Sequence, residues 1–237
     1  MWITGLTCIG KDGRLNGKAS ESEPLRTREI LEYYGVPAPE NAANRLKQYL
    51  SMLEKNRKWA KLTSGGFREG SEAALADSVA VGKAIGFDEK KSLADLGAGG
   101  GLLGLVLAIC CAGCQVTLLE SSTRKAAFLA EAIGALKVQN ARVANARAES
   151  LLGVERFDLV VSRAAGKLSE IAPVALGLLP ARGRYIALKA PGIEPEIAEA
   201  LPRIEAASGR LVSSDAVDTP PFLSARTRAS LVLIEKL

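Results

Sequence analysis

Residues 93–104 of the chain, LADLGAGGGLLG, read as a short apolar strand that passes through a glycine-rich turn into a helix. Glycine tolerates positive φ and has no side chain, so a ligand can approach the backbone of such a turn closely. The N–H groups at the start of the helix point toward that ligand. Asp95 stands two residues before the first glycine, Gly97. We therefore expect a nucleotide-containing cofactor at this turn, next to Asp95, Gly97 and Gly99.

Short apolar strands alternate with helical segments from residue 91 onward. The expected strands are 93–96, 116–119, 142–145, 158–161 and 184–188, and the expected helices are 102–112, 124–136, 148–152, 169–179 and 194–206. This alternation predicts an α/β fold with a parallel sheet covered by helices on both faces. Two final strands, 210–217 and 230–235, have no helix between them and should pair antiparallel. The pattern is typical of the Rossmann-like seven-stranded sheet of class I S-adenosylmethionine-dependent methyltransferases, with its terminal antiparallel hairpin.

The part of the chain before residue 91 is expected to be mostly helical. Residues 1–22 lack periodicity and read as a flexible tail. Helices are expected over about 23–35, from 39 into the basic run at 55–61, and over 72–85. The predicted organisation is therefore a tail (1–22), an N-terminal helical extension (23–90) and a Rossmann-like domain (91–237).

The composition excludes several classes of protein. The chain has 237 residues, of which 48% are hydrophobic and 24% charged, as in a soluble globular protein with a sizeable core. It contains no histidine, which excludes Ser-His-Asp and Cys-His catalysis and HExxH metalloproteases. A net charge of +5 permits a polyanionic partner without requiring one.

The uncharged stretch at residues 102–119 is about as long as a membrane span. Gly113 divides it, and a buried helix followed by a buried strand gives the same apolar run, so no membrane span is expected. Three cysteines lie in this stretch, Cys110, Cys111 and Cys114. We expect small buried thiols rather than a metal or redox site, which is typical of a reducing cytoplasm.

Acidic residues follow the second and third expected strands. Glu120 lies 23 residues after Gly97, near the spacing of a ribose-binding acid, and a carboxylate can accept hydrogen bonds from two hydroxyls. The alternative is a solvent-facing acid in the first turn of a helix. Ala148 and Glu149 follow the third strand and are candidates for the adenine region of a cofactor, with a simple helix start as the alternative.

Cationic residues follow the fourth and fifth expected strands. Ser162 and Arg163 end the strand at 158–161, and Lys189 ends the strand at 184–188. Ligands of open α/β sheets bind at the carboxyl ends of the strands, so these side chains should face the active cleft. A surface ion pair is the alternative interpretation of Arg163.

Several motifs occur in a characteristic order. They are Asp-Leu-Gly-x-Gly-x-Gly (95–101), Thr117-Leu118-Leu119-Glu120-Ser121, Phe128-Leu129, Arg147-Ala148-Glu149, Ser162-Arg163-Ala164 and Ala187-Leu188-Lys189. Together they resemble the glucose-inhibited division protein B (GidB/RsmG) family of bacterial small-subunit ribosomal RNA guanine-N7 methyltransferases. The helical part fits as well, since Leu75-Ala76-Asp77-Ser78 resembles the family's Leu-x-Asp-Ser. The similarity covers roughly residues 25–237.

The resemblance implies S-adenosylmethionine as cofactor and a guanine N7 in 16S rRNA, free or in the small subunit, as substrate. It implies that Gly97 and Leu102 line the methionine and ribose, that Glu120 holds the ribose, that Ala148 and Glu149 meet the adenine region, and that Arg163 is the family's cofactor-site arginine. Guanine N7 carries a free lone pair. Alignment and exclusion of water are then the main tasks, with Arg163 in a positioning role, and neither a general base nor a metal is expected.

A cationic surface is expected to bind the RNA phosphates. Its candidate residues are Lys55, Arg57, Lys58, Lys61, Arg124, Lys125, Arg163 and Lys189. Trp59 lies inside this basic run and either stacks a base or packs between the extension and the sheet. We expect a monomeric cytoplasmic protein.

Two cationic pairs of the family are replaced by Ala73-Ala74 and Ala229-Ser230. This leaves two alternatives open, a divergent methyltransferase acting on another RNA or a small molecule, and a non-catalytic paralogue that binds RNA or cofactor. A nicotinamide dehydrogenase is a further alternative, because dinucleotide folds use the same glycine-rich turn, but the terminal strand pair and the absence of histidine argue against it.

Overall fold

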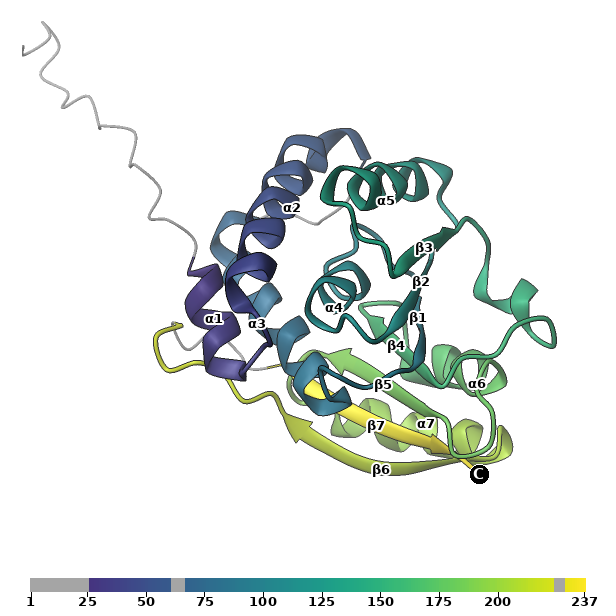
Figure 1. Ribbon diagram of the computed structural model, residues 1–237. Helices are drawn as coiled ribbons and strands as arrows, with labels where there is room; N and C mark the ends of the chain where they lie inside the picture. The colour runs from purple at the N-terminus through teal and green to yellow at the C-terminus, as the bar shows by residue number, and fades with distance from the viewer. Residues whose placement is uncertain (1–25, 61–66, 224–228) are drawn as a thin grey trace, which may run out of the picture.

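A computed structural model describes residues 26–60, 67–223 and 229–237 of the chain. Its centre is a seven-stranded sheet in the order β3-β2-β1-β4-β5-β7-β6 (Figure 1). The strands are β1 (Ser92–Leu96), β2 (Gln115–Leu119), β3 (Ala141–Ala144), β4 (Leu159–Arg163), β5 (Arg184–Lys189), β6 (Gly209–Ala216) and β7 (Ser230–Lys236). The first five strands are parallel, and β7 runs antiparallel to both β5 and β6.

Helices cover both faces of the sheet. On one face lie α4 (Gly104–Cys110) and α5 (Thr123–Leu136), and on the other lie α6 (Leu168–Gly177) and α7 (Glu194–Ala206) (Figure 1). Buried strands in such a sheet alternate their side chains between two cores. In β4, Leu159 and Val161 join the core on the α4 side, whereas Val160 joins the core on the α6 side. The doubly wound class I methyltransferase sheet expected from the sequence is therefore confirmed.

Three N-terminal helices form a further layer outside α4 and α5. They are α1 (Thr27–Tyr34), α2 (Pro39–Ala60) and α3 (Phe67–Ile85) (Figure 1). Leucines 46, 50 and 53 recur at helical spacing on α2 and are fully buried. They share one hydrophobic cluster with α4, α5 and the strands. The helical extension therefore packs on the same core as α4, α5 and this face of the sheet.

Most of the expected elements form within one or two residues of their predicted bounds. The third helix begins at Phe67, five residues earlier than expected, and the segment after β3 is a single 3₁₀ turn, η1 (Ala148–Leu151). In the first helix the left-handed Gly35 terminates α1 as expected, but residues 23–25 and the tail 1–22 lie outside the described residues. The two last strands pair antiparallel as expected, and β7 lies between β5 and β6.

The apolar stretch after the glycine-rich turn is helix α4 followed by strand β2, both buried. Cys110, Cys111 and Cys114 are free and buried, as expected from the sequence. No helix in the described ranges is long and apolar enough to cross a membrane. Within the same ranges, no group of three acidic or cysteine side chains is arranged to hold a metal ion.

Candidate cofactor and substrate site

The glycine-rich turn between β1 and α4 has a backbone that only glycine adopts readily. Gly97 and Gly99 have φ values of 68° and 58°, in the left-handed region. The amide of Ala98, between them, donates to the Leu119 carbonyl at 3.0 Å and so fixes the turn to the end of β2. A Cβ atom on Gly99 would have only the Gly97 carbonyl oxygen nearby, at 3.8 Å. The turn therefore presents open backbone at the carboxyl edge of the sheet.

Asp95 anchors the start of helix α4. Its side chain is buried, and Oδ2 accepts a hydrogen bond from the Gly104 amide at 2.8 Å. Burial raises the pKa of Asp95 to about 7, although the Gly104 amide acts in the opposite direction. The carboxyl group thus links the end of β1 to the start of α4 and fixes the shape of the turn between them.

Glu120 lies directly beside the turn, at the end of β2. Its Oε2 accepts from the Gly99 amide at 2.9 Å and its Oε1 accepts from the Ser122 amide at 2.8 Å. Asn145 donates to the Glu120 carbonyl at 2.8 Å and holds the backbone in place. A carboxylate has about four acceptor sites, so two amide donors leave capacity for two hydroxyl groups.

Helices α2 and α3 also contact the glycine-rich turn. The Tyr49 hydroxyl donates to the Gly100 carbonyl at 2.6 Å, and the Ser78 hydroxyl donates to the Leu102 carbonyl at 2.6 Å. Both side chains are fully buried. Sequence reasoning missed Tyr49, because its only local signal is an apolar position on a helix. Ser78 occurs in the Leu-x-Asp-Ser motif, which was the available signal for it.

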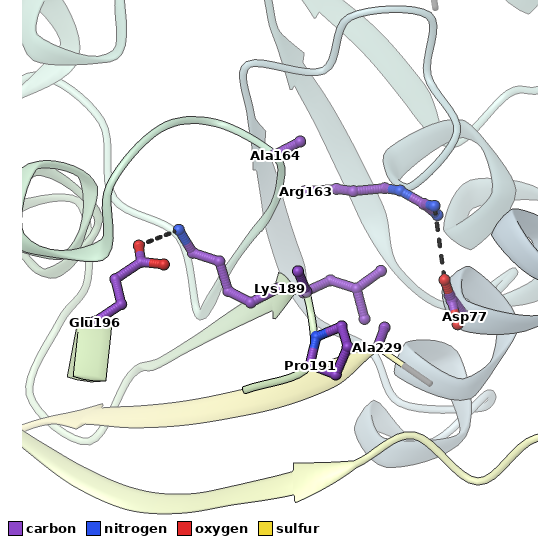
Figure 2. A pocket seen from close by; sticks show the side chains of 9 residues that line it. Asp77, Arg163, Ala164, Lys189, Pro191, Glu196 and Ala229 are labelled. Atoms are coloured by element: carbon purple, nitrogen blue, oxygen red, sulfur yellow. Dashed lines mark hydrogen bonds and ion pairs between the residues drawn. The ribbon is translucent and has the colours of Figure 1, made fainter. Parts of the chain in front are cut away.

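Arg163 leaves the end of β4 and points toward α3 (Figure 2). Its Nη1 donates to the Ala74 carbonyl at 2.8 Å, and its Nη2 lies 3.6 Å from Asp77 Oδ2. Burial lowers the pKa of Arg163, while the Asp77 charge opposes that effect. The described contacts of Arg163 therefore fasten the helical extension to the sheet, beside the predicted cofactor position.

An open pocket of about 410 Å³ lies at the carboxyl ends of β4 and β5 (Figure 2). It is lined by Asp77, Arg163, Ala164, Leu188, Lys189, Ala190, Pro191, Glu196 and Ala229. The loop after β4 also faces the glycine-rich turn, since Ala165 Cβ is 3.6 Å from the place of a Cβ on Gly97. The turn and the pocket therefore lie on either side of the same loop.

Lys189 and Glu196 form an ion pair in the wall of this pocket. Lys189 Nζ lies 2.7 Å from Glu196 Oε1 and donates to the Gly166 carbonyl at 2.6 Å (Figure 2). The Leu168 amide donates to the same Glu196 oxygen. Despite the cost of burial, these donors lower the pKa of Glu196. The Lys189 ammonium thus has internal partners, and an RNA contact by it stays a prediction.

The other predicted site residues are distributed around this edge of the sheet. Ala148 and Glu149 begin η1, just after β3. Lys55 and Arg124 are exposed, Lys125 is half-buried, and they lie on α2 and α5, which pack together. Leu102, in the turn, is half-buried. Arg57, Lys58 and Trp59 lie on α2, but the structure describes none of their side chains, and Lys61 lies outside the described residues.

Comparisons with known proteins agree on one family. The family model of rRNA small subunit methyltransferase G (GidB) matches residues 42–220. The ribosomal RNA small subunit methyltransferase G of Pelotomaculum thermopropionicum is 33% identical over 215 residues, 89% of each chain. That of Stenotrophomonas maltophilia is 41% identical over 157 residues, 65% of this chain and 72% of its own.

Solved structures confirm the fold. TYW2 of M. jannaschii, in complex with AdoMet, has a TM-score of 0.51 at 19% identity over 67% of this chain and 74% of its own. The fibrillarin pre-rRNA processing protein of Methanococcus jannaschii has a TM-score of 0.51 at 18% identity, over 70% of this chain and 76% of its own. With its class I methyltransferase sheet, its glycine-rich turn and the match over residues 42–220, the chain belongs to the rRNA small subunit methyltransferase G (GidB) family.

Proposed function

We propose that the protein transfers the methyl group of S-adenosylmethionine to N7 of a guanine in the 16S rRNA of the small ribosomal subunit. The observation that carries the proposal is the position of an open pocket next to the glycine-rich turn. The turn would hold the cofactor and the pocket the target base, with the loop that follows Arg163 between them. Family membership supports the substrate class.

The residues around the turn fit S-adenosylmethionine. The open backbone at Gly97 and Gly99 would hold its methionine end, and the free acceptor sites of Glu120 would hold the ribose hydroxyls. Ala148 and Glu149, one strand further along the edge, would meet the adenine region. Bound there, S-adenosylmethionine supplies a methyl group on a sulfonium sulfur.

The protein's part in the reaction is alignment rather than proton transfer. Guanine N7 attacks with a lone pair that carries no proton, so no side chain has to act as a base. Arg163 is held by the Ala74 carbonyl and would keep the pocket wall fixed beside the cofactor. Tyr49 and Ser78 would keep the turn itself in register. These groups act as positioning residues.

Contact with RNA is proposed for the cationic residues named above, among them the described residues Lys55 on α2 and Arg124 and Lys125 on α5. Clustered cations bind phosphates by releasing counterions. We infer that the protein acts in the cytoplasm, where ribosomal subunits are assembled, and as a monomer.

Methyl transfer with nucleotide mapping tests the proposal. The protein is incubated with radiolabelled S-adenosylmethionine and either isolated 30S subunits or naked 16S rRNA, and labelled positions are mapped by cleavage at N7-methylguanosine. We expect label at one guanine. Label at another atom or on another substrate would support a divergent methyltransferase. Cofactor binding without transfer to either RNA would support a non-catalytic paralogue.

A further inference from the structure

Asp77 of helix α3 lies in the wall of the pocket, and no described residue donates a hydrogen bond to its carboxylate. Its side chain is only 18% exposed. Among the residues that the structure describes, its partner is Arg163, whose Nη2 lies 3.6 Å from Asp77 Oδ2 (Figure 2). That distance is too long for a hydrogen bond. A mostly buried carboxylate of this kind is costly unless donors arrive from elsewhere.

The other charged groups of the pocket already have close partners. Glu196 accepts from Lys189 and from the Leu168 amide, and Lys189 also donates to a backbone carbonyl. Arg163 donates to the Ala74 carbonyl. Among the described residues of the pocket, Asp77 is therefore the carboxylate with neither oxygen in a hydrogen bond, whereas Glu196 already uses one of its two oxygens.

The remaining lining suits the face of a flat ring. Ala164, Leu188, Ala190, Pro191 and Ala229 contribute apolar surface to the pocket. Enzymes that modify an extruded base commonly stack it between apolar side chains and read its Watson–Crick edge by hydrogen bonds. The pocket combines both features, an apolar wall and a carboxylate with both oxygens open.

A carboxylate is complementary to one base edge in particular. Guanine presents two adjacent donors, N1–H and the 2-amino group, which match the two oxygens of an ionised carboxylate. Adenine, cytosine and uracil do not present two adjacent donors on that edge. N7 of guanine lies on the opposite, major-groove side of the base, so a carboxylate on the Watson–Crick edge leaves N7 free to react.

We propose that Asp77 selects guanine by accepting hydrogen bonds from N1–H and the 2-amino group of the target base. The inference rests on the proposed function and adds a specificity-determining residue to it. Arg163 supports this role, because its charge counteracts the rise in the pKa of Asp77 that burial causes and so favours the ionised form. Asp77 thereby contacts the Watson–Crick edge of the base from the side of α3. The loop after β4, on the other side of which lies the glycine-rich turn, also lines the pocket.

The first test uses the wild-type protein and one changed atom group in the RNA. Inosine keeps N7, O6 and N1–H of guanosine but lacks the 2-amino group. Once the target guanosine is mapped, 16S rRNA with inosine at that position is assembled by splinted ligation. If subunits are the substrate, this RNA is then reconstituted with ribosomal proteins. Loss of one charge-assisted hydrogen bond should lower kcat/KM about 10- to 100-fold. Equal rates on both RNAs would overturn the proposal.

The second test removes the carboxylate. In Asp77→Ala we expect kcat/KM on the guanosine RNA to fall about 100-fold and the preference over inosine to shrink below about threefold, with cofactor affinity unchanged. Asp215→Ala, a matched change of an exposed carboxylate on β6, should leave both properties as in the wild type. A variant that still prefers guanosine as strongly as the wild type would refute the role of Asp77.

The outcomes separate this inference from the proposed function. Wild-type protein that methylates neither RNA overturns the proposed function, and the inference with it. Wild-type protein that methylates both RNAs equally overturns the inference alone. Should Asp77→Ala not fold, the isosteric Asp77→Asn and the wild-type comparison of the two RNAs still decide the question.

Discussion

The two acidic residues beside the glycine-rich turn have different surroundings, which predict different roles. Glu120 accepts two backbone amides at the edge of the sheet and keeps free acceptor sites. Asp95 is buried beneath the turn, and that burial raises its pKa. One carboxylate can meet a ligand, whereas the other holds the loop that meets it.

Replacing Glu120 by alanine should weaken S-adenosylmethionine binding. The change removes a charged acceptor for two ribose hydroxyls, which costs about 1.5–3 kcal/mol of binding free energy. Isothermal titration calorimetry measures it, with Glu131→Ala, an exposed acid on α5, as control. Unchanged affinity in Glu120→Ala would remove Glu120 from the ribose role.

Asp95 should make the stability of the protein depend on pH. Its pKa is about 7 in the folded protein against an ordinary value of 3.8, so between these values the folded protein holds a proton that the unfolded chain has lost. The contribution of Asp95 to the free energy of unfolding is therefore largest in acid and is lost as the pH rises toward and through 7. Between pH 5 and 8 the fall is about 3 kcal/mol at most, at about 1.4 kcal/mol for each pKa unit.

Denaturant titrations of the wild type and Asp95→Asn at pH 5 and 8 check this expectation. The amide can still accept from Gly104 but does not ionise, so the variant should lose less stability between the two pH values. Identical pH dependence in both proteins would show that Asp95 is ionised in the folded state.

Arg163→Ala should reduce methyl transfer about 100-fold or more, because misplacement of the reacting groups by about 1 Å has that effect. The hydrogen bond to Ala74 predicts a loss of about 1–2 kcal/mol in the free energy of unfolding as well. Turnover and thermal unfolding are measured on the same preparation. Wild-type turnover would exclude a positioning role.

At the scale of elements, the start of α4 is packed directly against β1 and β2. A Cβ atom on Gly104 would lie 2.6 Å from Asp95 Oδ2 and 2.7 Å from Asp95 Cβ, and would also clash with Leu118. The helix can therefore approach the strands only because this residue is glycine. The approach brings the Gly104 amide within reach of Asp95.

Gly104→Ala should lower the free energy of unfolding by about 2–3 kcal/mol, since the added methyl group overpacks a rigid site. Gly134→Ala is the matched control, because a Cβ there meets nothing within 4 Å. It replaces a glycine inside α5 and should raise stability by up to about 1 kcal/mol. Chemical denaturation of both variants measures the difference, and equal effects would contradict the close packing of α4.

For the whole molecule, the relevant property is the distribution of its +5 net charge. Of the cations proposed to contact RNA, those that the structure describes belong to α2, α5 and the carboxyl edge of the sheet. Lys90, Arg182 and Arg184 are exposed near the starts of β1 and β5, at the opposite edge. An electrostatic interface at one edge should respond to charge changes there and not at the other.

Reversing Lys55, Arg57 and Lys58 together to glutamate should weaken RNA binding and reduce its dependence on salt, without altering cofactor affinity. Reversal of Lys90, Arg182 and Arg184 changes the net charge equally and serves as control. Filter binding at several salt concentrations, with calorimetry for the cofactor, measures both. Equal losses in the two triple variants would indicate a general charge effect.

The local sequence was sufficient for the order and type of the elements. Alternating apolar strands and helices, the glycine-rich turn and an acid 23 residues after Gly97 are features of chain order and short-range periodicity. They predict the doubly wound sheet and bring Glu120 to its carboxyl edge, because parallel strands end on the same side. The terminal strands were also recognisable, from the absence of a helix between them.

Tertiary packing alone decided which side chains meet at that edge. Tyr49 lies 51 residues before Gly100, and Arg163 lies 89 residues after Ala74, so no local spacing links these partners. The sequence places Lys189 at the edge, but its ion pair with Glu196 depends on how α7 packs against the sheet. The physical reason is that periodicity fixes which face a residue occupies, whereas the packing of distant elements fixes what lies opposite that face.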